Sequence, residues 1–273
     1  MSEDLPNASV PEEQKKKTAP RGVVRRSLLG LLKAGVVIGG LAAILLAGAW
    51  LNVMPGGWRV RALWAQRRAK RQIATFQAEA PKIPAGSVIF LGSSTIEKMP
   101  FDKTYPGLPW VNRGVGGEDT VGMLDRLEPS LPVARPAGVV VNGGANDFRA
   151  GRRETPVVVA RTAAVVDAVR ARFPGVPIVI VEPIPQSTEE PDLVLQLTYA
   201  AEALEVYARD NHYPYVRTCR PPLITEDGQL RADMTAADGR HPNEAAYRVL
   251  AKWIADEGGE ATAPLRGAKV SAQ

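Results

Sequence analysis

The stretch that decides the fold is residues 88–94, with the sequence Val-Ile-Phe-Leu-Gly-Ser-Ser. Four apolar residues stop abruptly at Gly92, and two hydroxyl side chains follow. This pattern is typical of a buried parallel strand that ends at the carboxyl edge of a sheet and leads into a helix. Because open α/β sheets bind ligands at that edge, Ser94 is a candidate nucleophile. A simple helix cap would also account for the Gly-Ser-Ser segment taken alone.

Further apolar runs recur along the chain and alternate with helical stretches. We expect strands at 88–91, 110–112, 138–141, 178–181 and 215–217, and helices near 120–130, 155–173, 192–210 and 242–256. This alternation predicts an α/β fold with a parallel sheet covered on both faces. If the strand order is the flavodoxin-like 2-1-3-4-5, the first strand lies between the second and the third. The loops after these three strands then surround one crevice.

The second and third of these loops are rich in glycine. Residues 112–120 have the sequence Asn-Arg-Gly-Val-Gly-Gly-Glu-Asp-Thr, and residues 143–147 have the sequence Gly-Gly-Ala-Asn-Asp. Glycine lets a backbone N–H approach a ligand closely, and an asparagine amide offers two donors. Beside Ser94 such donors can form an oxyanion hole. A phosphate loop is disfavoured, since G-x-G-x-x-G and the Walker Lys-Ser/Thr pair are missing; a structural loop without a ligand is the other alternative.

A fourth segment, Asp238-Gly239-Arg240-His241, comes just before the last predicted helix. An aspartate three residues before a histidine on a turn can hold the imidazole Nδ1–H and leave Nε2 free to accept a serine proton. The other histidine, His212, follows a predicted helix, where contact with the helix dipole is its expected role. Alone the Asp-x-x-His pattern is a weak signal, but after the serine, glycine and asparagine segments it is a strong one.

In this order the four segments resemble the four blocks of the SGNH (GDSL-type) hydrolases, over residues 84–256. The resemblance implies a three-layer, flavodoxin-like fold with a five-stranded parallel sheet, and a carboxylic ester hydrolase with a Ser-His-Asp triad. It assigns Ser94 as the nucleophile, His241 as the base and Asp238 as the residue that orients the base. It also implies an oxyanion hole made of the Ser94 N–H, the Gly117 N–H and the Asn146 side chain.

Two positions depart from the family pattern. Ser93 replaces the aspartate that is common before the nucleophile, and Glu118-Asp119 stands where many members have Asp-Thr or Ser. These departures bear on the substrate more than on the catalytic set.

Several other classes of function are disfavoured. The net charge is +5, but the basic residues cluster before residue 72 around an apolar segment, so we expect a membrane and no nucleic acid as partner. The single cysteine, Cys219, excludes an intrachain disulfide, and with only two distant histidines it offers no zinc cluster, so we expect no metal or cofactor. Residues 92–96 lack the second glycine of the G-x-S-x-G elbow of α/β-hydrolases.

The chain is long enough for one domain of ordinary size and an appendage. We expect a disordered basic tail at 1–26, a transmembrane signal anchor at 27–54, a basic juxtamembrane helix or linker at 55–82, the hydrolase domain at 83–257 and a flexible tail at 258–273.

The predicted anchor rests on residues 34–51, which are uncharged and almost wholly apolar. As a helix they would span roughly 27 Å, close to one bilayer core. Basic residues flank this segment on both sides and are slightly more numerous on the N-terminal side. We therefore expect a single-pass membrane protein with its catalytic domain outside the cytoplasm. The alternative is a secreted protein whose signal peptide is cleaved, because residues 47–49, Ala-Gly-Ala, resemble a peptidase site.

The sequence thus predicts a membrane-anchored serine esterase that hydrolyses esters of lipids or acetylated sugars through an acyl-enzyme on Ser94. Two alternatives use the same fold. One is an O-acyltransferase in which an alcohol replaces water, and the other is a non-catalytic binding module.

Overall fold

The computed structural model describes residues 35–40, 42–43, 47, 57–151, 154–187 and 189–266. The chain divides into two compact units, residues 1–64 and 65–273. The strands are β1 (Val88–Gly92), β2 (Trp110–Gly114), β3 (Gly138–Asn142), β4 (Ile178–Val181) and β5 (Tyr215–Val216). The α-helices are α2 (Gly57–Glu79), α3 (Ser94–Glu97), α4 (Phe101–Thr104), α5 (Thr120–Asp125), α6 (Leu127–Ser130), α7 (Ala145–Gly151), α8 (Thr155–Arg172), α9 (Pro191–Asp210) and α10 (Glu244–Glu257). Three short 3-10 helices are η1 (Ala80–Lys82), η2 (Ala232–Met234) and η3 (Gly259–Leu265).

The five parallel strands form one sheet in the order β2-β1-β3-β4-β5, which confirms the predicted flavodoxin-like order. Gly92 at the end of β1 lies in register with Gly114 of β2 and Asn142 of β3. Because the three strands end level, the loops that follow them begin at one edge of the sheet.

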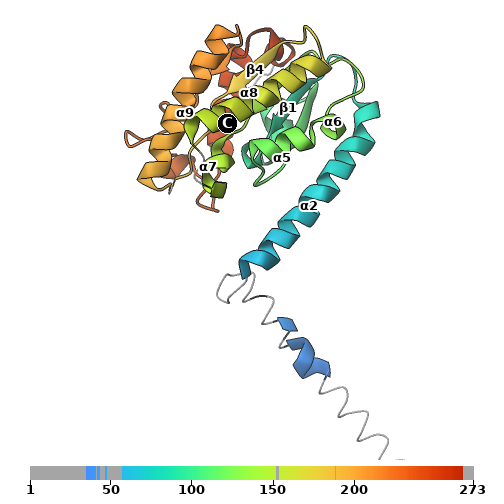
Figure 1. Ribbon diagram of the computed structural model, residues 1–273, viewed down its shortest axis with the longest axis vertical. Coiled ribbons are helices and arrows are strands. Elements are labelled where there is room, and N and C mark those ends of the chain that lie inside the picture. The colour runs from blue at the N-terminus through green and yellow to red at the C-terminus, as the bar shows by residue number, and fades with distance from the viewer. Residues whose placement is uncertain are drawn as a thin grey trace, which may run out of the picture. The chain divides into compact units, whose positions relative to one another are not determined.

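Helices cover both faces of this sheet, which makes three layers (Figure 1). Along β1, alternate side chains point to opposite faces. Val88 and Phe90 belong to a core with α4, α10 and η3, whereas Ile89 and Leu91 belong to a second core with α5, α6 and α8. Both faces are apolar, so a strand in the middle of the sheet has the continuous apolar sequence that marks residues 88–91.

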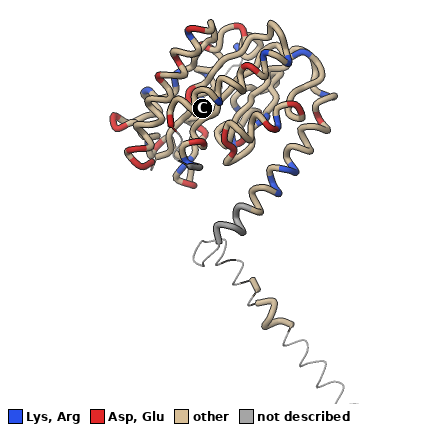
Figure 2. Tube along the Cα trace, in the orientation of Figure 1, with Lys and Arg blue, Asp and Glu red and all other residues tan. Residues whose placement is uncertain are grey.

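The C-terminal part of α2 belongs to the larger unit. Figure 2 shows Lys and Arg along this helix, as expected for a basic segment. Near its end the Phe76 ring is buried under the Arg113 guanidinium, 4.5 Å from the ring centroid, and Gln72 donates a hydrogen bond to the Gly114 carbonyl. Residues 72–79 therefore pack on the edge strand β2, so this part of the predicted linker belongs to the domain.

The structure does not show the anchor predicted for residues 27–54. No helix among the described residues is both long and apolar enough to cross a membrane. Most of that segment, and all of the predicted tail at 1–26, lies outside the described residues.

The prediction of a flexible tail from residue 258 is wrong as far as residue 265. Residues 259–265 form η3, in which Ala261, Thr262 and Leu265 are buried. A Cβ at Gly138 would lie 2.0 Å from the Ala261 carbonyl oxygen, so the start of β3 and η3 touch through backbone alone. The small residues that suggest flexibility in the sequence permit this close contact.

Candidate active site

Ser94 is the first residue of α3, directly after β1 and Ser93. The turn between them is tight, since a Cβ at Gly92 would lie 2.3 Å from the Ile96 side chain and 2.8 Å from the Asn142 carbonyl oxygen. Only glycine fits, so the sequence Gly-Ser-Ser brings the helix close to the end of the strand. The expected position of Ser94 at the carboxyl edge of the sheet is confirmed.

His241 reaches Ser94 from the other end of the chain. Its Nε2 lies 2.9 Å from Ser94 Oγ, and its Nδ1 lies 2.7 Å from Asp238 Oδ2. Gly239 has a φ of 68° and forms the turn that brings Asp238 Oδ1 within 3.0 Å of the His241 backbone N–H. The structure thus joins these three side chains in one continuous chain of hydrogen bonds.

The loop of His241 also differs from the prediction at its end. We expected the last helix to begin near residue 242, but its N-cap is Asn243, which accepts a hydrogen bond from the Ala246 N–H at 3.0 Å. Pro242 forms an isolated bridge with Thr235 instead. Asn243 fixes the helix start, and the bridge fixes the loop before it.

A residue that the sequence analysis did not single out, Lys98, lies beside the imidazole. Its Nζ is 2.6 Å from Asp238 Oδ2 and 2.8 Å from His241 Nδ1. Burial raises the pKa of Asp238, but hydrogen bonds from Lys98, from His241 and from the backbone of both His241 and Arg240 outweigh it and hold this pKa well below its usual range. Asp238 is therefore a carboxylate at any pH at which the protein would be assayed.

The predicted oxyanion donors come from two loops that contact each other. Gly117 has a φ of 80°, a backbone conformation that glycine adopts at no steric cost. The Asn146 Nδ2 donates a hydrogen bond to the Glu118 carbonyl at 2.9 Å, and Arg149 donates to the Asn146 Oδ1 at 3.2 Å. Asn146 therefore holds the glycine loop with one amide hydrogen and has a second one to donate.

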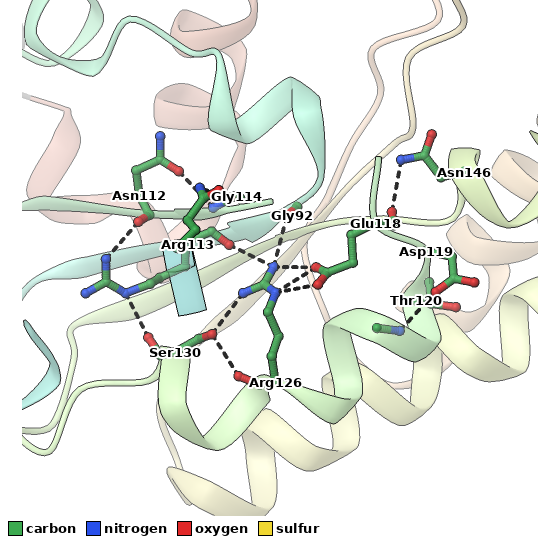
Figure 3. A network of polar contacts seen from close by, with 12 residues as sticks. Gly92, Asn112, Arg113, Gly114, Glu118, Asp119, Thr120, Arg126, Ser130 and Asn146 are labelled. Carbon is green, nitrogen blue, oxygen red and sulfur yellow. Dashed lines mark hydrogen bonds and ion pairs between the residues drawn. The ribbon is translucent and has the colours of Figure 1, made fainter. Parts of the chain in front are cut away.

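Beneath this loop lies a buried polar network centred on Arg126 (Figure 3). Its guanidinium pairs with the Glu118 carboxylate at 2.7 Å and donates to the carbonyls of Gly92 at 3.1 Å and Arg113 at 3.0 Å. A further hydrogen bond reaches Ser130. Arg126 thus ties the ends of β1 and β2 to the loop that carries Gly117.

Arg126 lies between α5 and α6, where we expected one continuous helix over 120–130. The break lets its side chain turn into the core, where it is only 2% exposed. Burial lowers the pKa of Arg126, and burial raises the pKa of Glu118 to about 7 although the pairing with Arg126 opposes that shift.

Asp147 supports the same loop from below. It is fully buried and accepts hydrogen bonds from the Thr120 hydroxyl at 2.6 Å and the Thr120 N–H at 2.9 Å. Asp119 meanwhile caps α5 by accepting from the Gly122 N–H. The three polar side chains that directly follow Gly117 therefore each have a defined partner; they are Glu118, Asp119 and Thr120.

Ser94 and His241 line a small cavity of about 20 Å³. Pro183, Ile184 and Pro185 line one side. The other residues of its wall are Ser93, Thr95, Asn142, Gly143, Ala145, Arg149, Gln186, Arg240 and Pro242, so neither Gly117 nor Asn146 is among them. Elsewhere in the described part of the chain, no three histidine, cysteine or acidic side chains are grouped to hold a metal ion.

Comparison with known proteins points to one family. The model of the GDSL-like Lipase/Acylhydrolase family matches residues 99–249, a stretch that includes Asp238 and His241 and begins after Ser94. No protein of curated function matches the chain.

Solved structures share the fold. A protein from Streptococcus pneumonia, provisionally described as a platelet activating factor, has a TM-score of 0.64 at 20% identity, over 72% of this chain and 96% of that one. A GDSL-like lipase from Bacteroides thetaiotaomicron has a TM-score of 0.56 at 22% identity, over 67% and 94%. A member of the lipolytic G-D-S-L family from Veillonella parvula has a TM-score of 0.52 at 20% identity, over 62% and 96%.

Proposed function

Because the chain belongs to the GDSL-like lipase/acylhydrolase family, whose activity is ester hydrolysis, we propose that it is a serine esterase acting through an acyl-enzyme on Ser94. The observation that carries this proposal is the hydrogen-bonded chain of Ser94, His241 and Asp238. A carboxylate on Nδ1 keeps Nε2 unprotonated and facing the hydroxyl, which is the arrangement that activates a serine.

In the proposed reaction, Ser94 Oγ attacks the ester carbonyl carbon while His241 Nε2 takes the hydroxyl proton. The tetrahedral intermediate collapses when its C–O bond to the alcohol breaks, and His241 gives its proton to the leaving oxygen. Water then attacks the acyl-enzyme and loses a proton to His241, and the acid leaves as Ser94 recovers that proton. Asp238 stays ionised throughout and holds the imidazole.

The negative oxygen of the intermediate requires donors close to Ser94. The Ser94 and Gly117 N–H groups and the free amide hydrogen of Asn146 are the proposed donors. Support comes from the Asn146 bond to Glu118, which fixes the amide against the glycine loop. A preorganised donor of this kind contributes about 2.7–4 kcal/mol to the transition state.

The size of the cavity beside Ser94 supports the proposal that the substrate carries a small acyl group. The cavity volume of about 20 Å³ exceeds the roughly 10–15 Å³ that one water needs, so the space suits a group of about the size of a methyl. Ile184, which is 5% exposed, closes one wall as part of the core. Of the two predicted substrate classes, acetylated sugars therefore fit this site better than long-chain lipids.

The experiment that tests the proposal measures hydrolysis of p-nitrophenyl esters with acyl chains from acetyl to octanoyl. We expect acetate to be the best substrate, Ser94→Ala to abolish turnover, and a fluorophosphonate to label the wild-type chain at Ser94. Persistent activity in Ser94→Ala would refute the nucleophile, and absence of labelling would favour a non-catalytic binding module. Added alcohols distinguish the alternative O-acyltransferase, because only a transferase would form new ester in preference to acid.

The membrane anchor at 27–54 is also part of the proposal, with the catalytic domain outside the cytoplasm. It rests on the uncharged apolar residues 34–51 and their basic flanks. The test is whether the full chain stays with membranes after an alkaline carbonate wash; release into the supernatant would refute the anchor.

A further inference from the structure

The ammonium group of Lys98 contacts both the proposed base, His241, and the carboxylate of Asp238 that orients it. Lys98 Nζ, Asp238 Oδ2 and His241 Nδ1 form a triangle with sides of 2.6, 2.7 and 2.8 Å. Lys98 is the C-cap residue that follows α3, and its backbone N–H donates to the Ser94 carbonyl at 3.0 Å. One short helix therefore carries both the candidate nucleophile and a cation that faces the base.

The three contacts of this triangle cannot all be hydrogen bonds at the same time. Nδ1 carries either a proton or a lone pair, so it either donates to Asp238 or accepts from Lys98. Because Asp238 is ionised, its Oδ2 can accept from Nδ1–H and from Lys98 together. Nδ1–H and Lys98 Nζ then both donate to Asp238 Oδ2, which is why these two nitrogens lie close together. The full positive charge of Lys98 is therefore beside the imidazole.

The other charged groups around His241 do not cancel this effect. Arg240 comes from the same loop as Asp238, and Arg149 lines the same cavity from α7 while paired with Glu189. Asp238 is the only carboxylate with a recorded contact to the imidazole among the described residues, and Lys98 shares it. A positive charge on the imidazole would thus meet a carboxylate whose charge is already compensated.

We propose that Lys98 is a positioning residue that holds Asp238 against His241 and extends the activity of the enzyme to lower pH. A nearby like charge disfavours the protonated imidazole, which is the form that cannot accept the Ser94 proton. Removing the ammonium group also frees Asp238 to stabilise that form. Both effects act in the same direction. This inference rests on the proposed function, since it needs His241 to act as the base.

The test is the pH profile of kcat/KM for p-nitrophenyl acetate in Lys98→Met and Lys98→Arg. Lys98→Met keeps the unbranched side chain as far as Cε and removes the charged Nζ, and we expect the acid limb to move up by about one pH unit. On that limb the rate would then be about tenfold lower than in the wild type. Lys98→Arg keeps the charge and is expected to keep the limb.

The matched control is Lys103→Met. Lys103 also pairs with a carboxylate at 2.7 Å, but its partner Glu244 lies on the surface outside the cavity wall. This control should leave the profile unchanged, as thermal unfolding should remain unchanged in all three variants.

Three outcomes would overturn the proposal. These are an acid limb that stays in place while Lys98→Met lowers the rate equally at every pH, a limb that moves down, and a limb that moves equally in Lys103→Met. If the wild-type chain has no Ser94-dependent esterase activity, the proposed function fails first. The two failures are thus distinguishable.

Discussion

The two sides of Ser94 are built from opposite kinds of polar contact. On one side, Lys98 and Asp238 are 42% and 39% exposed, and they approach His241 from a helix end and a loop. On the other side, Arg126 and Glu118 are 2% and 9% exposed and are linked to the ends of two strands. One side is a set of charges in contact with water, and the other is a network inside the protein.

We infer from this difference that the two sides of Ser94 have different roles. Exposed ion pairs contribute little to the free energy of unfolding, so the side chains around His241 can be selected for proton transfer. A buried arginine with all its partners fixed costs several kcal/mol if it is disrupted, so Arg126 holds the glycine loop in one conformation. We therefore expect substitutions on the first side to change the rate, and those on the second to change stability as well.

The largest expected effect is on the exposed side. His241→Ala should lower kcat by about 10⁴-fold or more, because the serine loses its base. The free energy of unfolding should change by less than about 1 kcal/mol, since the neighbours of His241 remain in contact with water. Ester hydrolysis and urea unfolding measure the two quantities. An unfolding loss of several kcal/mol would contradict the comparison.

The next largest effect is on the buried side. Arg126→Met should lower the free energy of unfolding by about 3–5 kcal/mol, because it leaves the Glu118 carboxylate buried without its partner. The matched control is Arg172→Met, whose contact with Glu128 is 3.5 Å long and lies on the surface. That variant should change the same free energy by less than about 1 kcal/mol. Equal losses in the two variants would show that burial of Arg126 has no special effect.

The smallest expected effect is on how the free energy of unfolding depends on pH. Burial raises the pKa of Glu118 from 4.5 to about 7, so between these pH values the folded state binds more protons than the unfolded state. The free energy of unfolding should therefore fall as the pH rises, by up to about 1.4 kcal/mol per unit from this group. Glu118→Gln has no proton to lose. The difference between wild type and variant should thus depend on pH from 4.5 to 7 and level off above; a flat difference would refute the shift.

Much of the fold follows from local sequence pattern. Residues 88–91 and 138–141 are continuously apolar because both faces of their strands are covered, and the structure has strands there. The flavodoxin-like order was enough to bring the loops after the first three strands to one edge of the sheet. The Asp-x-x-His pattern, and not the strand order, indicated that Asp238 and His241 join Ser94 there. Their catalytic roles remain proposals.

The contacts that Lys98 and Arg126 make could not be predicted from the local sequence pattern. Lys98 meets Asp238 only because α3 ends after one turn, and its partner lies 140 residues away. Pro129 is a local signal that the helix breaks, because it cannot donate to the carbonyl of Asp125, where α5 ends. Arg126 itself looks like one more basic residue in an amphipathic stretch, and nothing in the local spacing indicates its buried partners. Contacts between distant side chains depend on where each backbone element stops, which the sequence pattern locates only to within a few residues.

The close backbone contact at Gly114 limits which substitutions this protein can accept. A Cβ at this position would lie 2.2 Å from the Glu97 backbone nitrogen, so α3 rests directly on the last residue of the edge strand. Any side chain there would push the short helix outward and carry Ser94 and Lys98 with it. We therefore expect evolution to tolerate replacements around the cavity far more readily than at this glycine, which couples the sheet edge to the candidate active site through main-chain atoms alone.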